Sequence, residues 1–250
     1  MIRFGFRRMI RDKKQFDQKW FSEVYDYYCK RVVSNNSVLS NYDYYMQILL
    51  MKYTRVDSFD AIKKHFEELI SLLVTYKQKK YERRITDIFD FKHLERDIYP
   101  LLAFAIALPI SDDTWKMLTD IYPEGRDYIT DRLIATRTPA RKITNFNIWS
   151  KTAPAHHKYF KLLGEALDID DKEEQIKLIQ KHLEKWHQKK WRDDVSIGSD
   201  PDYPKKRPRY YGQFSYEVAV VVMAFDIDDS SFKEDIYYPK ELVEYYRQRT

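Results

Sequence analysis

The stretch IDDSSFKEDIYYP, residues 227–239, brings carboxylates, hydroxyls and two tyrosines together within thirteen residues. A calcium loop would need more regularly spaced oxygens and a glycine at its turn, and this stretch has neither. The same residue types are typical of helix caps, and Asp229 or Ser230 could cap a short helix. Tyr238 precedes a proline and must be extended, while Pro239 fits the first turn of a final helix. We therefore interpret the stretch as the junction between helices.

Histidine and cysteine do not occur at the spacing of a metal site. None of the histidines forms an H-x-x-x-H pair, and no cysteine cluster accompanies them. The histidines are His65, His93, His156, His157, His182 and His187. The single cysteine, Cys29, lies among apolar residues and is expected to be a core thiol. We predict no metal and no cofactor.

Two carboxylate–lysine pairs have the local spacing of metal-dependent nucleases. Asp90-Phe-Lys92 and Asp170-Asp-Lys172 each place a carboxylate two residues before a lysine. Those enzymes hold this pair on a β-hairpin, whereas both pairs here fall at expected helix starts. Acidic residues in a first helical turn are explained by capping and by the helix dipole. We therefore predict no catalytic residues and no enzymatic activity.

Glu217 lies in the most apolar segment of the chain, between Phe214 and Val218. A buried carboxylate must be paired or neutral, because an isolated buried charge costs at least several kcal/mol. We expect Glu217 to be buried and to meet an Arg or Lys from another helix. The functional alternative is a general base, which would need a second acid or a metal within reach.

The composition favours an all-α fold. The 250 residues include five Gly and nine Pro, and 33% are charged, which suits long helices better than a many-turned β-structure. One cysteine excludes an intramolecular disulfide, and no apolar run is long enough to span a bilayer, so a cytoplasmic protein is expected. The net charge of +5 suggests an anionic or nucleic-acid partner, although the basic residues gather at the N-terminus and the last 41 residues are acidic.

Apolar periodicity predicts a multi-helix, bundle-like protein of two helical halves packed together. A loop over 136–154 is the best candidate boundary, which gives an N-terminal region 1–140 and a C-terminal region 150–250. Ser58 and Asp171 are the expected caps of two of the helices. Residues 210–225 could form a buried strand or a buried helix, and their length favours the helix. Helices are expected near 13–33, from 58, over 91–108, 112–121 and 125–135, over 159–167 and from 172.

The C-terminal residues 210–246 resemble the signature of the PoNi family of bacterial immunity proteins. The opening motif YGQFSYE, the turn IDDSS and the ending YYPKELV occur here in the family's order and spacing, although Phe214 stands where the family usually has Trp. Leu183–Trp186 resembles the family's Trp-bearing helix, and Arg11–Asp12 resembles its N-terminal half more loosely. The signature residues, for which we expect a structural role, are Tyr211, Gly212, Glu217, Asp228, Asp229, Ser230, Tyr238 and Pro239.

This resemblance implies an all-helical, non-enzymatic protein that binds and neutralises a secreted DNase toxin of the PoNe type, a nuclease of the PD-(D/E)xK superfamily. No direct contact with nucleic acid and no membrane association are expected, and the oligomeric state is left open. The alternative is a basic, helical nucleic-acid-binding regulator, supported by the basic N-terminus and by Lys205–Arg209 (KKRPR).

Carboxylates are the expected contact residues for such a toxin, because a DNase cleft is lined with cations. Two acidic clusters fit this expectation, and we rank the cluster near residue 170 first because some acids of the other should be committed to capping. The alternative is that both clusters are solvated helix ends. The candidate contact residues are Asp168, Asp170, Glu173, Glu174, Asp228, Glu234 and Asp235.

Overall fold

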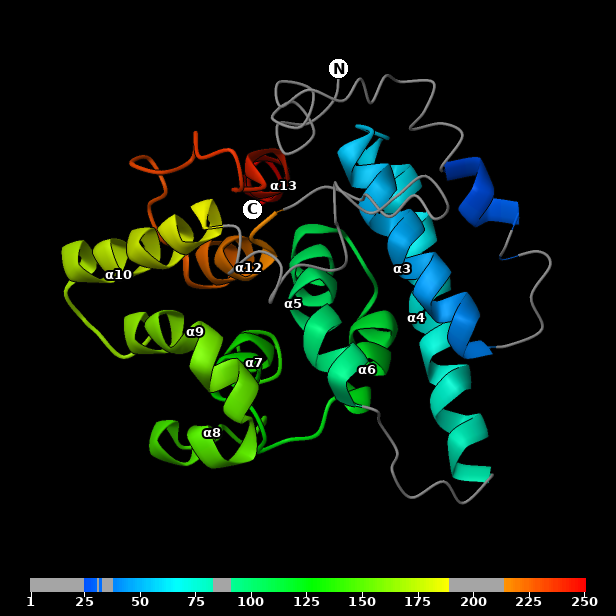
Figure 1. Cartoon of the computed structure of the whole chain (residues 1–250), viewed down its shortest axis with the longest axis horizontal. Helices are drawn as coiled ribbons and strands as arrows, with labels where there is room; N and C mark the ends of the chain where they lie inside the picture. Colours follow the sequence, from blue (N-terminus) through cyan, green and yellow to red (C-terminus); the bar gives the residue numbers. More distant parts are fainter. Residues whose placement is uncertain (1–24, 31, 33–37, 83–90, 189–213) are drawn as a thin grey trace. The chain divides into compact units, whose positions relative to one another are not determined.

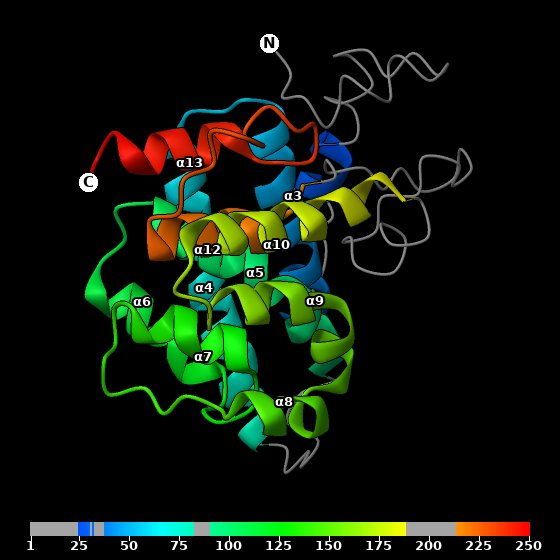
Figure 2. The same cartoon turned by 90° about the vertical axis from the view of Figure 1, so that its left-hand side faces the viewer.

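The computed structural model describes residues 25–30, 32, 38–82, 91–188 and 214–250 (Figures 1 and 2). Within these ranges the regular structure is helical and contains no strand, which confirms the predicted all-α class. The described helices fall into two compact units whose segments alternate along the chain. None of the described helices is long and apolar enough to cross a membrane.

The first unit is built on a pair of long helices, α3 (Val38–Thr54) and α4 (Phe59–Glu82), which pack side by side (Figure 1). The shorter α6 (Asp112–Ile121) packs against α4. Ser58 caps α4 as predicted, because its hydroxyl accepts a hydrogen bond from the backbone N–H of Ala61. The sequence analysis missed α3, although its buried Met46, Leu49 and Tyr53 follow helical spacing.

The turn between α3 and α4 holds Val56 in a left-handed conformation with φ 68°. A β-branched residue is disfavoured in this region, because its side chain crowds the backbone. Arg55 and Asp57 brace the turn on both sides of Val56, with Nη2 of Arg55 2.7 Å from Oδ2 of Asp57. Val56 itself is 41% exposed.

The second unit holds most of the described helices, and Figure 1 shows α12 against α5 within it. Contacts between α9 and α10 and between α8 and α9 extend this unit, and α13 covers both α12 and α5. Its elements are α5 (Phe91–Ala107), α7 (Tyr128–Ala135), α8 (Phe146–Thr152), α9 (Pro154–Ala166), α10 (Lys172–Glu184), the 3-10 helix η1 (Lys185–His187), α12 (Tyr216–Phe225) and α13 (Lys240–Arg247).

Helix α12 is the most apolar element of the second unit, and its residues from Tyr216 to Met223 are all buried. A helix that is apolar on every side must be surrounded by other elements. The segment that could have been a strand is thus a buried helix, as its length favoured. It ends at Asp226, which adopts the left-handed conformation of a C-cap with φ 49°.

Two sequence-based expectations for this unit need correction or remain open. The expected loop 136–154 contains α8, so the prediction of an unbroken loop was wrong. Residues 122–195, including this segment, belong to one unit. The assignment of regions 1–140 and 150–250 stays a prediction.

Candidate functional site

Glu217 lies in the first turn of α12 and is almost fully buried, with 4% of its surface exposed. Its Oε1 accepts hydrogen bonds from Nε1 of Trp186 at 2.7 Å and from the hydroxyl of Ser215 at 2.8 Å. The third contact is Nε2 of His182, 3.2 Å away. Three elements of the second unit therefore meet at one carboxylate oxygen.

His182 is buried completely, and this burial lowers its pKa below the ordinary histidine value despite the neighbouring Glu217. The imidazole is therefore neutral near pH 7, with its Nε2–H donated to Glu217. The prediction that Glu217 is buried and paired is confirmed. The expected Arg or Lys partner was wrong: within the part of the chain that is described, the donors are an indole, a hydroxyl and a neutral imidazole.

The turn after α12 is organised by a second signature carboxylate, Asp229, which is also buried. It accepts hydrogen bonds from the hydroxyl of Tyr238 at 2.8 Å and from Nη1 of Arg247 at 2.6 Å. Arg247 also donates Nη2 to the carbonyl of Ile227 at 2.9 Å, so α13 is fastened to the end of α12. Asp229 therefore has a structural role within this unit.

The rest of the IDDSSFKEDIYYP stretch consists of turns. Asp228 accepts hydrogen bonds from the backbone N–H and the hydroxyl of Ser230, both at 2.9 Å. Pro239 is the residue before α13, close to its predicted place in the first turn. The short helix that Asp229 or Ser230 was expected to cap does not form, because residues 230–234 are turns.

The higher-ranked acidic cluster lies where α9 passes into α10, and we call it the acidic junction. As predicted, Asp171 caps α10: its Oδ1 accepts the backbone N–H of Glu173 at 2.9 Å and that of Glu174 at 3.2 Å. Asp168 accepts a hydrogen bond from the hydroxyl of Tyr128 and pairs with Arg132 at 3.6 Å. The acidic junction consists of Glu165, Asp168, Asp170, Asp171, Glu173 and Glu174.

The acids of the junction differ in how far they are committed to the fold. Asp170, Asp171, Glu173 and Glu174 are all exposed, in one run that Lys172 interrupts. Glu174 has a surface ion pair with Lys177 at 3.5 Å, which costs little to break. Asp170 and Glu173 accept no side-chain hydrogen bond or ion pair from the described residues, so their charges are available to a partner.

The acids of the second cluster, around residue 230, are more fully engaged. Glu234 forms a short ion pair with Lys240, and Asp235 contacts Nε2 of His187 at 2.7 Å. Asp235 also caps the following turn by accepting the backbone N–H of Tyr237 at 2.8 Å. This agrees with ranking the second cluster below the acidic junction, although which residues contact a partner stays a prediction.

Sequence analysis missed a second buried carboxylate with the same kinds of donors, Asp127. Its side chain caps α7 through the backbone N–H of Thr130 at 2.7 Å, and its Oδ2 contacts Nε1 of Trp149 at 2.7 Å and Nδ1 of His156 at 2.8 Å. Burial alone would raise the pKa of Asp127, but the charge and hydrogen bond of His156 together with the capping bond hold this pKa below the ordinary aspartate value. Only the position of Asp127 before an apolar helix hinted at its cap.

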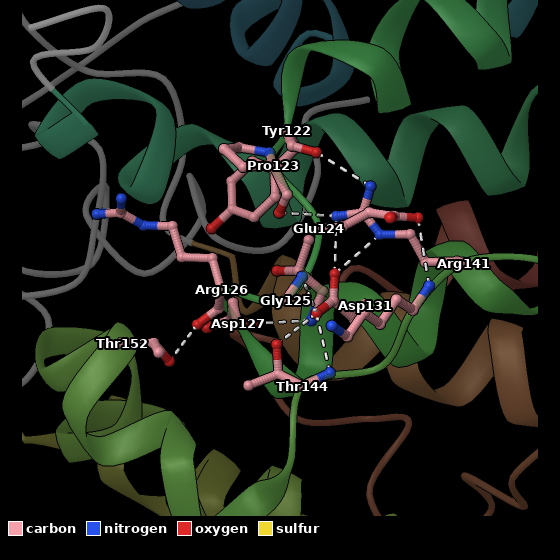
Figure 3. Close-up of polar contacts among 12 residues, drawn as sticks. Tyr122, Pro123, Glu124, Gly125, Arg126, Asp127, Asp131, Arg141, Thr144 and Thr152 are labelled. Carbon is pink, nitrogen blue, oxygen red and sulfur yellow. Dashed lines mark hydrogen bonds and ion pairs between the residues drawn. The ribbon is translucent and has the colours of Figure 1, made fainter.

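A further buried carboxylate, Asp131, ties the loop after α7 to the preceding turn (Figure 3). Nε of Arg141 donates to Oδ1 of Asp131 at 2.8 Å, while Thr144 donates its backbone N–H at 3.1 Å and its hydroxyl at 2.5 Å to Oδ2. Arg141 also reaches the carbonyls of Tyr122 at 3.0 Å and Pro123 at 2.9 Å. Sequence analysis offered no signal for this network.

Several sequence-based candidates lie outside the described residues. They are Tyr211 and Gly212 of the signature, Asp90 of the carboxylate–lysine pair and the basic segments 1–24 and 205–209. Among the residues that are described, no group of three or more His, Cys, Asp or Glu side chains is arranged to hold a metal ion. The Asp170–Lys172 pair lies at the start of α10, where the helix cap explains it.

Comparison with known protein families gives a match to the C-terminal part of the chain. Residues 125–242 match the family model described as PoNe immunity proteins (PoNi), C-terminal. Neither the curated proteins nor the solved structures gave a significant match. The matched region contains Glu217, Asp229, Asp127, Asp131 and the whole acidic junction.

Proposed function

We propose, because residues 125–242 match the PoNi C-terminal family model, that this chain is an immunity protein that binds a PoNe-type DNase toxin and neutralises it. The protein acts by binding and carries out no catalysis itself. Its partner is a protein, and no cofactor takes part. The family match to the PoNe immunity proteins is the observation that carries this proposal.

The geometry of the matched region supports a binding role. Its buried carboxylates are each satisfied by donors from other elements, which accounts for them as parts of the scaffold. The exposed acids of the junction can form ion pairs with a partner. A DNase must present cations where it binds DNA phosphates. We propose that Asp170, Glu173 and Glu174 contact those cations and that Asp168, held by Tyr128 and Arg132, borders the contact. The acids Asp228, Glu234 and Asp235 form a lower-ranked alternative surface.

The test compares two matched pairs of charge reversals. Glu173→Lys with Glu174→Lys changes two exposed acids in the first turn of α10, and Asp112→Lys with Asp113→Lys changes two exposed acids in the first turn of α6. Both variants alter the net charge equally and disturb a helix dipole equally. The partner is the nuclease domain of the cognate PoNe-type toxin, with affinity and association rate measured at two salt concentrations.

The parent chain should bind this domain, and the α10 variant should associate at least tenfold more slowly at low salt, with a smaller effect at higher salt. The α6 variant should behave as the parent does. If the parent binds and both variants associate at equal rates, the acidic junction is not part of the interface. No binding by the parent would contradict the proposed function itself.

A further inference from the structure

Two exposed isoleucines lie near each other in the sequence of the second unit, on the loop after α7 and on α8. Ile143 is 45% exposed and Ile148 is 51% exposed, and with Val56 they are the large apolar residues that the described part of the chain leaves exposed. Because their positions differ by five, their Cα atoms lie at most about 18 Å apart. This distance fits inside one protein–protein interface of standard size.

The loop that carries Ile143 is held by hydrogen bonds to buried groups. Arg141 and Thr144, which flank the two-residue tip Lys142–Ile143, both donate to the buried Asp131 (Figure 3). The backbone N–H of Lys142 donates to Oε1 of Glu124 at 3.2 Å, which holds the tip itself. Both ends of the tip are thus attached to the interior, and Ile143 is presented without the ordering cost that a flexible loop would incur on binding.

Helix α8, which carries Ile148, is also held firmly in the second unit. Asn145 caps it by accepting the backbone N–H of Asn147 at 2.9 Å. On its inner side, the ring of Phe146 packs against Trp149 and Tyr128 at centroid distances of 5.7 and 5.1 Å. The inner face of α8 is therefore occupied, and Ile148 is directed to solvent by a helix that cannot easily turn.

The charged residues nearest in sequence to the two isoleucines are cations. The sequence has no Asp or Glu between Asp131 and Glu165, a stretch with seven Lys and Arg residues. Arg137, Lys142 and Lys151 are exposed close in sequence to the isoleucines. Glu124, an exposed acid of the preceding turn, accepts a hydrogen bond from the Lys142 backbone beside this surface. We call Ile143 and Ile148 with these three cations the isoleucine surface.

We propose that the isoleucine surface is a docking site for a protein surface with an apolar centre bordered by carboxylates, and that this surface belongs to the toxin bound under the proposed function. The inference rests on that function but concerns a different part of the chain from the acidic junction. An acidic contact alone supplies on-rate and specificity. A stable interface also needs desolvated apolar anchors, and two rigidly held isoleucines meet that need.

The test uses Ile143→Asp with Ile148→Asp, and Val56→Asp as the matched control. All three residues are exposed, and an acid in the first turn of α8 agrees with its helix dipole, so the fold should persist; thermal unfolding of each variant checks this. Binding to the nuclease domain of the cognate PoNe-type toxin is measured by calorimetry. Plasmid DNA binding and sedimentation velocity are measured on the same samples.

The proposal expects the parent and Val56→Asp to bind the toxin domain equally and the double variant to lose at least 100-fold in affinity. Lys142→Glu should slow association at least fivefold at low salt. Unchanged toxin binding by a folded double variant would overturn the inference while leaving the proposed function intact. So would loss of DNA binding or of self-association in the double variant without loss of toxin binding. A parent that binds no toxin domain would overturn both.

Discussion

Replacing Glu217 by Ala is the sharpest test of how the second unit is held together. Oε1 of Glu217 satisfies an indole N–H, a hydroxyl and an imidazole N–H inside the protein. An unsatisfied buried donor costs about 1–3 kcal/mol, and the serine hydroxyl can turn to another acceptor. The loss of the other two bonds and of the buried side chain should lower the free energy of unfolding by about 4 kcal/mol. For a chain of this size that is about 8–16 °C in the midpoint of unfolding.

Two further variants separate the hydrogen bonds from the loss of volume and charge. Glu217→Gln keeps the carbonyl oxygen that accepts the bonds, so it should lose about half as much stability as Glu217→Ala. Glu184→Ala removes an exposed acid of the neighbouring α10 and should change little. Chemical denaturation and calorimetry give the values. A loss below about 1 kcal/mol for Glu217→Ala would refute the reasoning, and unchanged stability with lost toxin protection would move Glu217 from the scaffold to the binding site.

Three other changes test separate parts of the fold. Gly164→Ala should destabilise by about 1–3 kcal/mol despite the better helix propensity of Ala, because its Cβ would lie 2.7 Å from the Trp149 ring; a gain in denaturation midpoint would contradict the packing. Burial lowers the pKa of His65 to about 4, so stability should fall by about 2 kcal/mol from pH 7 to pH 5 as the unfolded state takes up a proton below pH 6.5; His65→Gln should remove this part of the pH dependence. Arg141→Met should cost about 3–5 kcal/mol in denaturant, because it leaves Asp131 without its cation; a change below 1 kcal/mol would show that the network does not hold the loop.

The helices were predictable where an apolar stripe and a cap coincide. Ser58 before α4 and Asp171 before α10 show this, because a cap is a local property of a few neighbouring residues. The sequence analysis assigned no helix to α3, which has the stripe, and α8 is a short helix inside a segment rich in Pro, Thr and Asn. Both were missed, because tertiary contacts such as the seating of Trp149 stabilise what local propensity does not.

The buried carboxylates show where sequence reasoning reaches its limit. The burial of Glu217 followed from its apolar neighbours, which are adjacent in sequence. Its partners did not, since Trp186 lies 31 residues away and any donor with the correct geometry could have served. For Asp127 and Asp131 even burial was invisible, because an Asp in a first helical turn is usually a solvated cap. The acidic junction could be located from the sequence, because acidic residues that follow one another along the chain are close in space whatever the fold.

Titration of the toxin's nuclease activity with the purified chain tests the central claim most directly. A fixed concentration of the nuclease domain of the cognate PoNe-type toxin is mixed with increasing amounts of this chain, and plasmid cleavage is followed by gel. The proposed function predicts that cleavage decreases as the chain is added and stops once a stoichiometric complex has formed, while an unrelated nuclease keeps its activity. Undiminished cleavage at saturating concentrations of folded protein would contradict it.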